Sequence, residues 1–160
     1  MNHVVGYRCT ICGAEFPPFP ELLTCPHCGE KGILDVLYNY DAVKKQLSKE
    51  TLAADPTNSM WRYAPLLPVE NDQNRFAEFL RIGWTPLYRS RSLEHELGIK
   101  ALYIKDDGIN PTASLKDRAS GVAVARAIEL GYDTVACSST GNAASSLAGQ
   151  VMFVLQMLLY

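Results

Sequence analysis

The most regular pattern of apolar and polar positions in this chain lies between residues 114 and 131. Apolar residues recur there at helical intervals, at Leu115, Ala119, Val122, Ala123, Ala127 and Leu130. This period predicts an amphipathic helix with one buried face. Ser114 and Asp117 have the spacing of a capping box, which predicts Ser114 as the N-cap, and Gly131 is a typical helix stop.

Short apolar runs on both sides of this helix predict strands. Residues 101–104 are typical of a buried strand, and residues 133–137 of a second, short buried strand. Small residues then predict a helix over residues 142–148. Strands that alternate with helices in this way indicate an α/β fold.

The pattern upstream of residue 101 is less regular. Residues 33–38 predict a strand, and Asp41 predicts the start of a short helix that runs to about residue 48. Residues 92–97 predict another helix, which Gly98 ends.

The composition is that of a soluble globular protein, with 48% hydrophobic residues, 20% charged residues and a net charge of −2. The first 32 residues hold two basic residues against three acidic ones, so they offer no basic face and nucleic acid is not an expected partner. Residues 151–160 are apolar at nine of ten positions. A segment of this length is too short to span a membrane, and no membrane partner is expected.

Two Cys-x-x-Cys-Gly motifs near the N-terminus indicate a metal site. The first motif holds Cys9 and Cys12, and the second holds Cys25 and Cys28. Four thiolates in two such pairs are the ligands of a tetrahedral zinc site, and each glycine permits the tight turn of a zinc knuckle. We therefore expect a structural zinc ribbon over residues 1–32, with His27 outside the ligand set.

Two disulfides are the alternative for the same four cysteines. Disulfides need an oxidising compartment, and the first residues lack the basic segment and apolar core of a secretion signal. Reduced cysteines and a cytoplasmic protein are therefore expected. The fifth cysteine, Cys137, is expected to be a small buried residue at the end of a strand.

Lys116 is the strongest candidate for chemistry. It falls in the first turn of the predicted helix, where the macrodipole opposes a cation by about 0.3–1 kcal/mol and favours the neutral amine of a Schiff-base lysine. Residues 138–142, one strand-helix unit later, read Ser-Ser-Thr-Gly-Asn. Their hydroxyls and the free N–H groups of the next helix make a site for a carboxylate or phosphate. A solvated surface lysine and an ordinary capping turn are the alternatives when each segment is taken alone.

Taken together, these segments resemble the pyridoxal-phosphate enzymes of the tryptophan-synthase-β-like fold (fold type II), and among them the threonine synthases. Residues 110–118 look like the family's cofactor-lysine motif, with Ala113 and Leu115 where glycine and phenylalanine are more usual. Residues 138–143 look like its substrate loop, and residues 83–87 look like its Gly-x-Thr-Pro-Leu segment. The resemblance covers residues 33–150.

The resemblance implies a role for each residue of the two motifs. Lys116 would bind pyridoxal 5'-phosphate covalently, and Asn142 would contact the cofactor's 3-hydroxyl. Ser139, Thr140 and Gly141 would help to hold the carboxylate of the substrate. The implied activity is a lyase of threonine biosynthesis that converts O-phosphohomoserine and water to threonine and phosphate. A threonine dehydratase, a cysteate synthase and a noncatalytic zinc-binding fragment are the alternatives.

The chain is short for this family. The resemblance implies a longer protein, compatible with a homo-oligomer, whose glycine-rich cradle for the cofactor phosphate follows the present C-terminus. We therefore expect a C-terminally truncated, impaired or inactive form with an incomplete α/β fold. Its expected divisions are a zinc ribbon at 1–32, a lead-in segment at 33–85, a partial lyase domain at 86–150 and an aberrant apolar tail at 151–160.

Overall fold

The structure, a computed structural model, describes residues 3–154 and 158–159, and the chain forms two compact units. The first unit comprises the residues up to Pro56 together with Trp61–Asp72, and the second comprises Thr57–Met60 and the residues from Gln73 onward. The four clustered cysteines lie in the first unit, and the lysine motif lies in the second. Each candidate site therefore belongs to a single unit.

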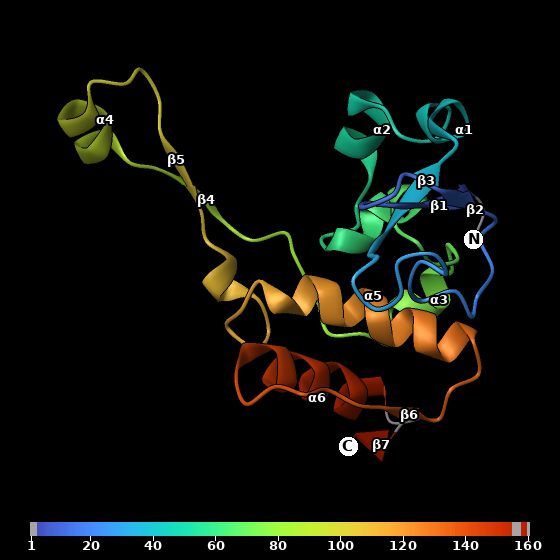
Figure 1. Ribbon diagram of the computed structural model, residues 1–160. Coiled ribbons are helices and arrows are strands. Elements are labelled where there is room, and N and C mark those ends of the chain that lie inside the picture. The colour runs from blue at the N-terminus through green and yellow to red at the C-terminus, as the bar shows by residue number, and fades with distance from the viewer. Residues whose placement is uncertain (1–2, 155–157, 160) are drawn as a thin grey trace. The chain divides into compact units, whose positions relative to one another are not determined.

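A three-stranded antiparallel sheet is the framework of the first unit (Figure 1). β1 (Val4–Cys9) lies between β2 (Glu15–Phe16) and β3 (Leu34–Tyr38). β3 confirms the strand expected at residues 33–38 and carries the sheet beyond residue 32. Because Cys9 is the last residue of β1, the sheet holds the start of the first cysteine motif in place.

Two short helices follow this sheet, where one had been expected. α1 (Tyr40–Lys44) is capped by the side chain of Asn39, and not by Asp41. α2 (Lys49–Ala54) starts at Ser48, whose hydroxyl takes part in a reciprocal capping box. The prediction of one helix to residue 48 is therefore wrong, because the Ser48 hydroxyl accepts the N–H of Thr51 and so caps a new helix.

Short elements connect the sheet to the lysine motif. They are η1 (Met60–Leu66), α3 (Gln73–Phe76), β4 (Leu87–Arg89), α4 (Arg91–Leu97), β5 (Tyr103–Lys105) and η2 (Asp107–Ile109). α4 confirms the helix expected at residues 92–97, and Gly98 ends it with a φ of 65°. The strand expected at residues 101–104 is β5, which pairs with β4. It was expected to be buried, but its residues are exposed, since a two-stranded ribbon covers neither of its own faces.

The second unit contains two long helices that lie side by side (Figure 1). α5 (Lys116–Glu129) confirms the helix expected from the apolar period, and α6 (Asn142–Val154) follows it. β6 (Thr134–Val135) lies between them in sequence and pairs in parallel with β7 (Leu158–Leu159). The strand expected at residues 133–137 is thus shorter than predicted, and it is not buried.

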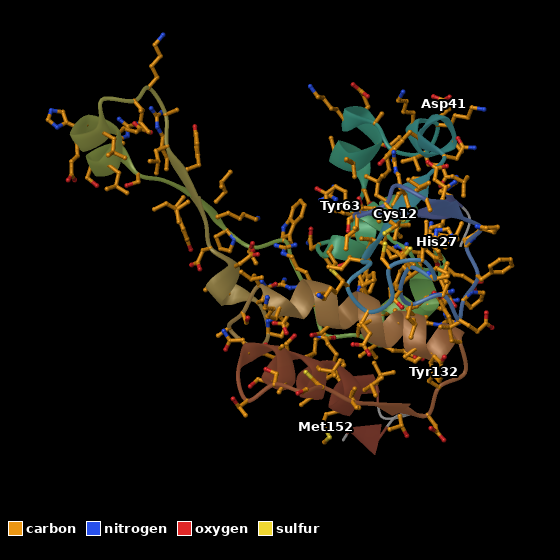
Figure 2. The ribbon with its side chains drawn as sticks, viewed as in Figure 1. Cys12, His27, Asp41, Tyr63, Tyr132 and Met152 are labelled. Atoms are coloured by element: carbon orange, nitrogen blue, oxygen red, sulfur yellow. The ribbon has the colours of Figure 1, made fainter. Side chains whose placement is uncertain are left out.

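α6 is longer than the helix expected at residues 142–148. It includes residues 151–154 of the expected aberrant tail, of which the two valines are buried and Met152 is exposed (Figure 2). Residues 155–157 and 160 of that tail lie outside the described residues. In the described part of the chain, every helix is too short or too polar to cross a bilayer.

The buried face of α5 differs from the predicted one. Of the six apolar residues expected to be buried, only Ala127 is. The buried positions are Asp117, Ser120, Gly121, Val124, Ala125 and Ala127. The predicted period is right and its phase is wrong, because the helix turns a hydrogen-bonded carboxylate and small residues inward, and a hydrophobicity pattern assigns such residues to the surface.

Gln150 on α6 is fully buried, and neither of its amide atoms has a hydrogen-bond partner among the described residues. Because a buried unpaired polar group costs about 1–3 kcal/mol, we expect Gln150→Met to raise the free energy of unfolding by about 1–2 kcal/mol. Urea unfolding measures the change. The exposed Gln46→Met is the control and should stay within about 0.5 kcal/mol of the parent chain. A Gln150→Met chain less stable than its parent would contradict an unpaired amide.

Candidate functional site

Lys116 is the first residue of α5, and its side chain is exposed. This confirms the predicted position in the first helical turn. The predicted capping box is wrong, since the N-cap is Leu115 and the buried Ser114 accepts the N–H of Lys116 at 3.1 Å from within the loop. The carboxylate of Asp117 does not close the box because it turns to other donors. Lys116 therefore follows a loop whose buried side is held by polar groups.

Ala113 in this loop has a φ of 55°, in the left-handed region that favours glycine. It is the position at which the resembling motif more usually has glycine. The left-handed conformation costs an L-residue about 1–2 kcal/mol, so the surrounding hydrogen bonds must hold the loop in this shape.

A polar cluster ties the lysine loop to the Gly-x-Thr-Pro-Leu segment. Asn110, only 4% exposed, accepts the N–H of Gly83 through Oδ1 at 2.9 Å. Asp107 accepts the hydroxyl of Thr85 at 2.7 Å and two N–H groups of Arg118 at 2.8 and 3.0 Å. Gly83 has a φ of 79°, and a Cβ there would stand 2.9 Å from the guanidinium of Arg118. The lysine loop and the Gly-x-Thr-Pro-Leu segment are thus joined by one network of hydrogen bonds.

Hydrogen bonds from Arg118 lower the pKa of Asp107 to about 2, and the Thr85 hydroxyl and the charge of Lys105 act in the same direction. Lys105 also donates through Nζ to the carbonyl oxygen of Thr85. Asp107 is therefore ionised at neutral pH and joins η2 to α5 by charge-assisted hydrogen bonds.

Asp117 connects the lysine loop to α6. Its carboxylate is fully buried and accepts the N–H and the hydroxyl of Thr112, each at 2.8 Å. It also accepts the hydroxyl of Ser146 on α6, again at 2.8 Å. These bonds set the starts of α5 and α6 at the same end of the helix pair (Figure 1).

The hydroxyl-rich loop ends at the N-terminus of α6, whose first residue is Asn142. Ser139 accepts the N–H of Gly141 through Oγ at 3.2 Å, while Thr140, Gly141 and Asn142 are exposed. In the described part of the chain, no atom beyond residues 140–142 lies within 4 Å of the place where a Cβ of Gly141 would stand. The space before this helix N-terminus is therefore open to a ligand, and free N–H groups of the first turn face such a space.

A mostly apolar hollow of about 180 Å³ lies beside α5 and α6. It is lined by Ala119, Ser120, Ala123, Ala136, Cys137, Ala143 and Leu147. The exposed alanines on α5 that were expected to be buried thus line this hollow. Cys137 is partly exposed there, so the prediction that it would be buried is wrong.

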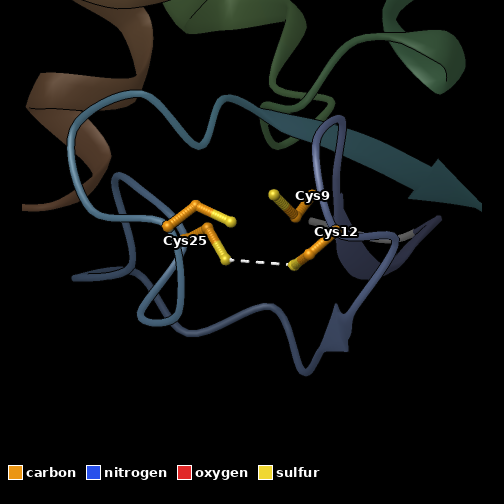
Figure 3. Close-up of side chains that lie close together, drawn as sticks. Cys9, Cys12 and Cys25 are labelled. Atoms are coloured by element: carbon orange, nitrogen blue, oxygen red, sulfur yellow. Dashed lines mark hydrogen bonds between the residues drawn. The ribbon is translucent and has the colours of Figure 1, made fainter.

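The four cysteines of the two motifs come together in the first unit (Figure 3). Their four Sγ atoms all lie within 4.8 Å of one another, and the Sγ atoms of Cys12 and Cys25 are 3.7 Å apart. All the cysteines are free thiols. A tetrahedral zinc site with Zn–S bonds of about 2.3 Å separates its sulfurs by about 3.8 Å, which matches the Cys12–Cys25 distance, and the four sulfurs lie close enough together to hold a metal ion.

Both cysteine motifs make the same turn. Gly13 donates its N–H to the carbonyl oxygen of Cys9 at 3.0 Å, and Gly29 donates to that of Cys25 at 2.8 Å, each glycine with a positive φ. The N–H of Ile11 donates to Sγ of Cys9 at 3.4 Å. Such N–H groups favour thiolate sulfur, which is the form that binds a metal.

The thiols of the cluster differ in acidity. The backbone N–H of Cys12 is the main cause that lowers the pKa of Cys9 to about 6. Burial raises the pKa of Cys25, and the contact with the Cys12 sulfur raises the pKa of Cys28 to about 12. His27 is exposed and packs its ring edge-on against Phe16 at 5.6 Å, outside the cluster (Figure 2).

The structure clusters one set of predicted residues and places two others at the starts of packed helices. The clustered set is the four cysteines, while Lys116 begins α5 and Asn142 begins α6. Sequence reasoning missed the supporting residues Asp107 and Ser146. Asp107 lies three residues before Asn110 with no periodic signal, and Ser146 is one small residue among several in α6. Their partners are distant in sequence, so only the fold could identify them.

Known proteins are similar to this chain in sequence, including the part that holds Lys116 and the 138–142 loop. Residues 79–150 match the family model of the pyridoxal-phosphate dependent enzymes. The chain is 44% identical over 141 residues to the threonine synthase of Methanosarcina acetivorans, which covers 88% of this chain and 33% of the relative. It is 45% identical to the threonine synthase of Methanocaldococcus jannaschii, with the same coverage of 88% and 33%.

A third relative matches a shorter stretch. The threonine synthase of Halalkalibacterium halodurans is 42% identical over 95 residues, which is 56% of this chain and 26% of the relative. The chain spans about a third of the length of the first two relatives. The matches to those two are longer than residues 33–150, so they include residues outside the stretch on which the resemblance was first based.

Proposed function

We propose that the chain carries the lysine-bearing part of a threonine synthase-like lyase, because residues 79–150 match the family model of the pyridoxal-phosphate dependent enzymes and the chain is 44–45% identical to two threonine synthases. The proposed reaction converts O-phosphohomoserine and water to threonine and phosphate. One observation carries the proposal: Lys116 begins α5 at the same end of the helix pair at which the 138–142 loop begins α6.

The residues at this end fit the proposed cofactor and substrate. Pyridoxal phosphate, when bound, supplies an aldehyde that condenses with an amine and a ring that withdraws electrons from the substrate's Cα. Lys116 would supply the amine and would later hold or release a proton at Nζ. Asn142 would contact the cofactor's 3-hydroxyl. The hydroxyls of Ser139 and Thr140, with the N–H groups beside Gly141, would hold the substrate carboxylate in the open space before α6.

Cofactor capture by these 160 residues is expected to be weak and turnover impaired. The sequence contains no Gly-x-Gly-x-x-Gly run for the cofactor phosphate, and such a run contributes much of the grip on a phosphate group.

The test is to incubate the chain with pyridoxal phosphate, reduce with borohydride and analyse the peptides by mass spectrometry. We expect the adduct to concentrate on Lys116, and Lys116→Arg to lower total labelling at least about tenfold, because an arginine cannot form the bond. Lys100→Arg is the matched control, since Lys100 is also exposed, and it should label like the parent chain. Labelling spread evenly over the lysines would refute the assignment of Lys116.

The substrate is a separate question, because a threonine dehydratase and a cysteate synthase use the same cofactor chemistry. The similarity of this chain to threonine synthases supports O-phosphohomoserine as its substrate. A chain extended to the length of these relatives should turn over O-phosphohomoserine and leave threonine and O-phosphoserine unchanged. Turnover of threonine alone would indicate a threonine dehydratase instead, and turnover of O-phosphoserine alone would indicate a cysteate synthase.

We also propose that Cys9, Cys12, Cys25 and Cys28 hold a structural zinc in an N-terminal ribbon. The free thiols, the short Sγ distances and the paired knuckle turns support this. A four-thiolate centre needs reduced cysteines, so we propose a cytoplasmic setting. A chain that binds zinc but gives no adduct on Lys116 would be a noncatalytic zinc-binding fragment.

A further inference from the structure

We propose that Asp117 is a positioning residue for the Lys116 site. Its buried carboxylate sets the direction in which Lys116 leaves α5 and the position of that lysine relative to the start of α6. This inference rests on the proposed function of Lys116 and concerns a neighbour to which no role in the reaction had been assigned.

The first argument is the environment of the carboxylate. Asp117 is fully buried, and its three hydrogen bonds come from neutral donors, two on Thr112 and one on Ser146. The guanidinium of Arg118, the next residue, pairs with Asp107 instead. Burying a carboxylate is costly unless hydrogen bonds satisfy it, so a site that satisfies it from two segments fixes both of them.

The second argument is the direction of the neighbouring side chain. The side chains of consecutive residues in an α-helix point about 100° apart. When one residue points into the protein interior, the residue before or after it therefore points away from that direction. Asp117 is buried and Lys116 is exposed, as this geometry requires. The carboxylate also holds the backbone N–H of Thr112, one residue before the strained Ala113. It therefore stabilises the loop conformation from which Lys116 emerges.

The third argument is the link to the second half of the site. Ser146 lies four residues after Asn142, one turn along the same face of α6. The bond from Ser146 to Asp117 thus holds the turn that carries Asn142 beside the turn that carries Lys116. Thr112 also packs closely on α6, since a Cβ at Gly149 would stand 2.9 Å from its methyl group. Asp117 is the one group that bonds to both sides of this contact among the described residues.

The experiment measures how fast the 160-residue chain forms the borohydride-trapped pyridoxal phosphate adduct on Lys116, and the share of all adducts that Lys116 takes. We expect Asp117→Ala to slow formation at least about tenfold and to lower that share, because a misplaced amine meets the aldehyde less often in a reactive geometry. Ser146→Ala removes one of the three bonds and should slow formation about threefold.

Two further variants separate positioning from stability. Val124→Ala removes two buried methyl groups from the same helix away from the hydrogen bonds, and it should keep the rate within about twofold even where its thermal midpoint falls as far as that of Asp117→Ala. Asp117→Asn should restore most of the lost rate. Its oxygen can accept the Thr112 N–H while its amide donates to the two hydroxyls, which can act as acceptors.

The possible results separate the proposed function from the positioning role. An unlabelled parent chain would overturn the proposed function, and this inference with it. A labelled parent chain with an unchanged rate in both Asp117→Ala and Ser146→Ala would overturn the positioning role alone. A Val124→Ala chain as slow as Asp117→Ala at equal stability would also overturn it, because general loosening would then explain the effect. If Asp117→Ala does not fold, Ser146→Ala and Asp117→Asn decide the question.

Discussion

Cys9→Ser is expected to abolish tight zinc binding by the first unit and to remove much of that unit's stability. Cys9 and Cys25 are 2% and 0% exposed, and the remaining fully buried apolar side chains of this unit are few. A unit of this size with so small a core depends on cross-links. Zinc binding in comparable small sites contributes about 10–16 kcal/mol near neutral pH, and that binding energy acts as folding energy.

The size of the effect follows from the ligand count. Loss of a contact outside the ligand shell already weakens metal binding about 10–100-fold, so loss of one ligand in four should weaken zinc binding more than about a hundredfold. A serine hydroxyl does not ionise near neutral pH and is a poor zinc ligand. Non-denaturing mass spectrometry measures the zinc bound per chain, and circular dichroism follows thermal unfolding with and without a chelator.

The fifth cysteine provides the control. Cys137→Ser changes a thiol in the second unit and should leave one zinc per chain and the chelator response unchanged. Zinc loss in both variants to the same degree would show that the effect is not specific to the cluster. Isolation of the parent chain with disulfides among Cys9, Cys12, Cys25 and Cys28 instead of zinc would contradict the metal site directly.

Asp107→Asn is expected to destabilise the second unit by about 1–3 kcal/mol at pH 7, because it replaces charge-assisted hydrogen bonds to Arg118. An asparagine has one acceptor oxygen, so its amide group would face either the guanidinium or the Thr85 hydroxyl. The pair is partly exposed, with side-chain exposures of 36% for Arg118 and 26% for Asp107, which keeps the cost below that of a fully buried pair.

The effect should depend on pH in a defined direction. The pKa of Asp107 is lowered in the folded chain to about 2 from an ordinary value of 3.8. Its contribution to stability is therefore fully present above about pH 5, falls as the unfolded chain gains protons near pH 4, and is lost below about pH 2. Denaturant unfolding at pH 7 and pH 3 should show a smaller difference between the two chains at pH 3.

Asp106→Asn is a matched control for this experiment. Asp106 precedes Asp107 and accepts only the N–H of Gly108 among the hydrogen bonds of its side chain in the described structure, at 3.1 Å. An asparagine oxygen can accept the same bond, so this variant should cost less than about 1 kcal/mol. A difference between Asp107→Asn and the parent chain that is equal at pH 7 and pH 3 would exclude the Asp107 charge as its cause.

Most of the helical part of the second unit could be predicted from local signals. The helix at residues 116–129 follows from its apolar period, and Gly131 with a φ of 74° comes directly after its C-cap, Leu130. The helix at residues 91–97 ends at Gly98 for the same backbone reason. The strands were less predictable. β5 and β6 were placed nearly correctly but expected to be buried, since apolar composition alone does not show whether another layer covers a strand.

The cluster of four cysteines was also predictable, because each Cys-x-x-Cys-Gly motif makes its turn through residues close in sequence. Lys116 and Asn142 could be identified by their motifs, each next to a helix start. Their chemical roles remain proposals. The sequence pattern gave a wrong prediction at Asp117. Its spacing from Ser114 is that of a capping box, yet the carboxylate accepts hydrogen bonds from Thr112 and Ser146 instead.

The sequence by itself determined the glycine turns, the spans of α4 and α5 and the residue types at both candidate sites, because these depend on backbone preferences and on neighbours within a few positions. The tertiary structure alone decided which face of α5 is buried and which groups support Lys116. The bond between Asp117 and Ser146 spans 29 residues, and that between Thr85 and Asp107 spans 22. A buried polar group is stable only where a distant partner satisfies it, and packing is what brings that partner within reach.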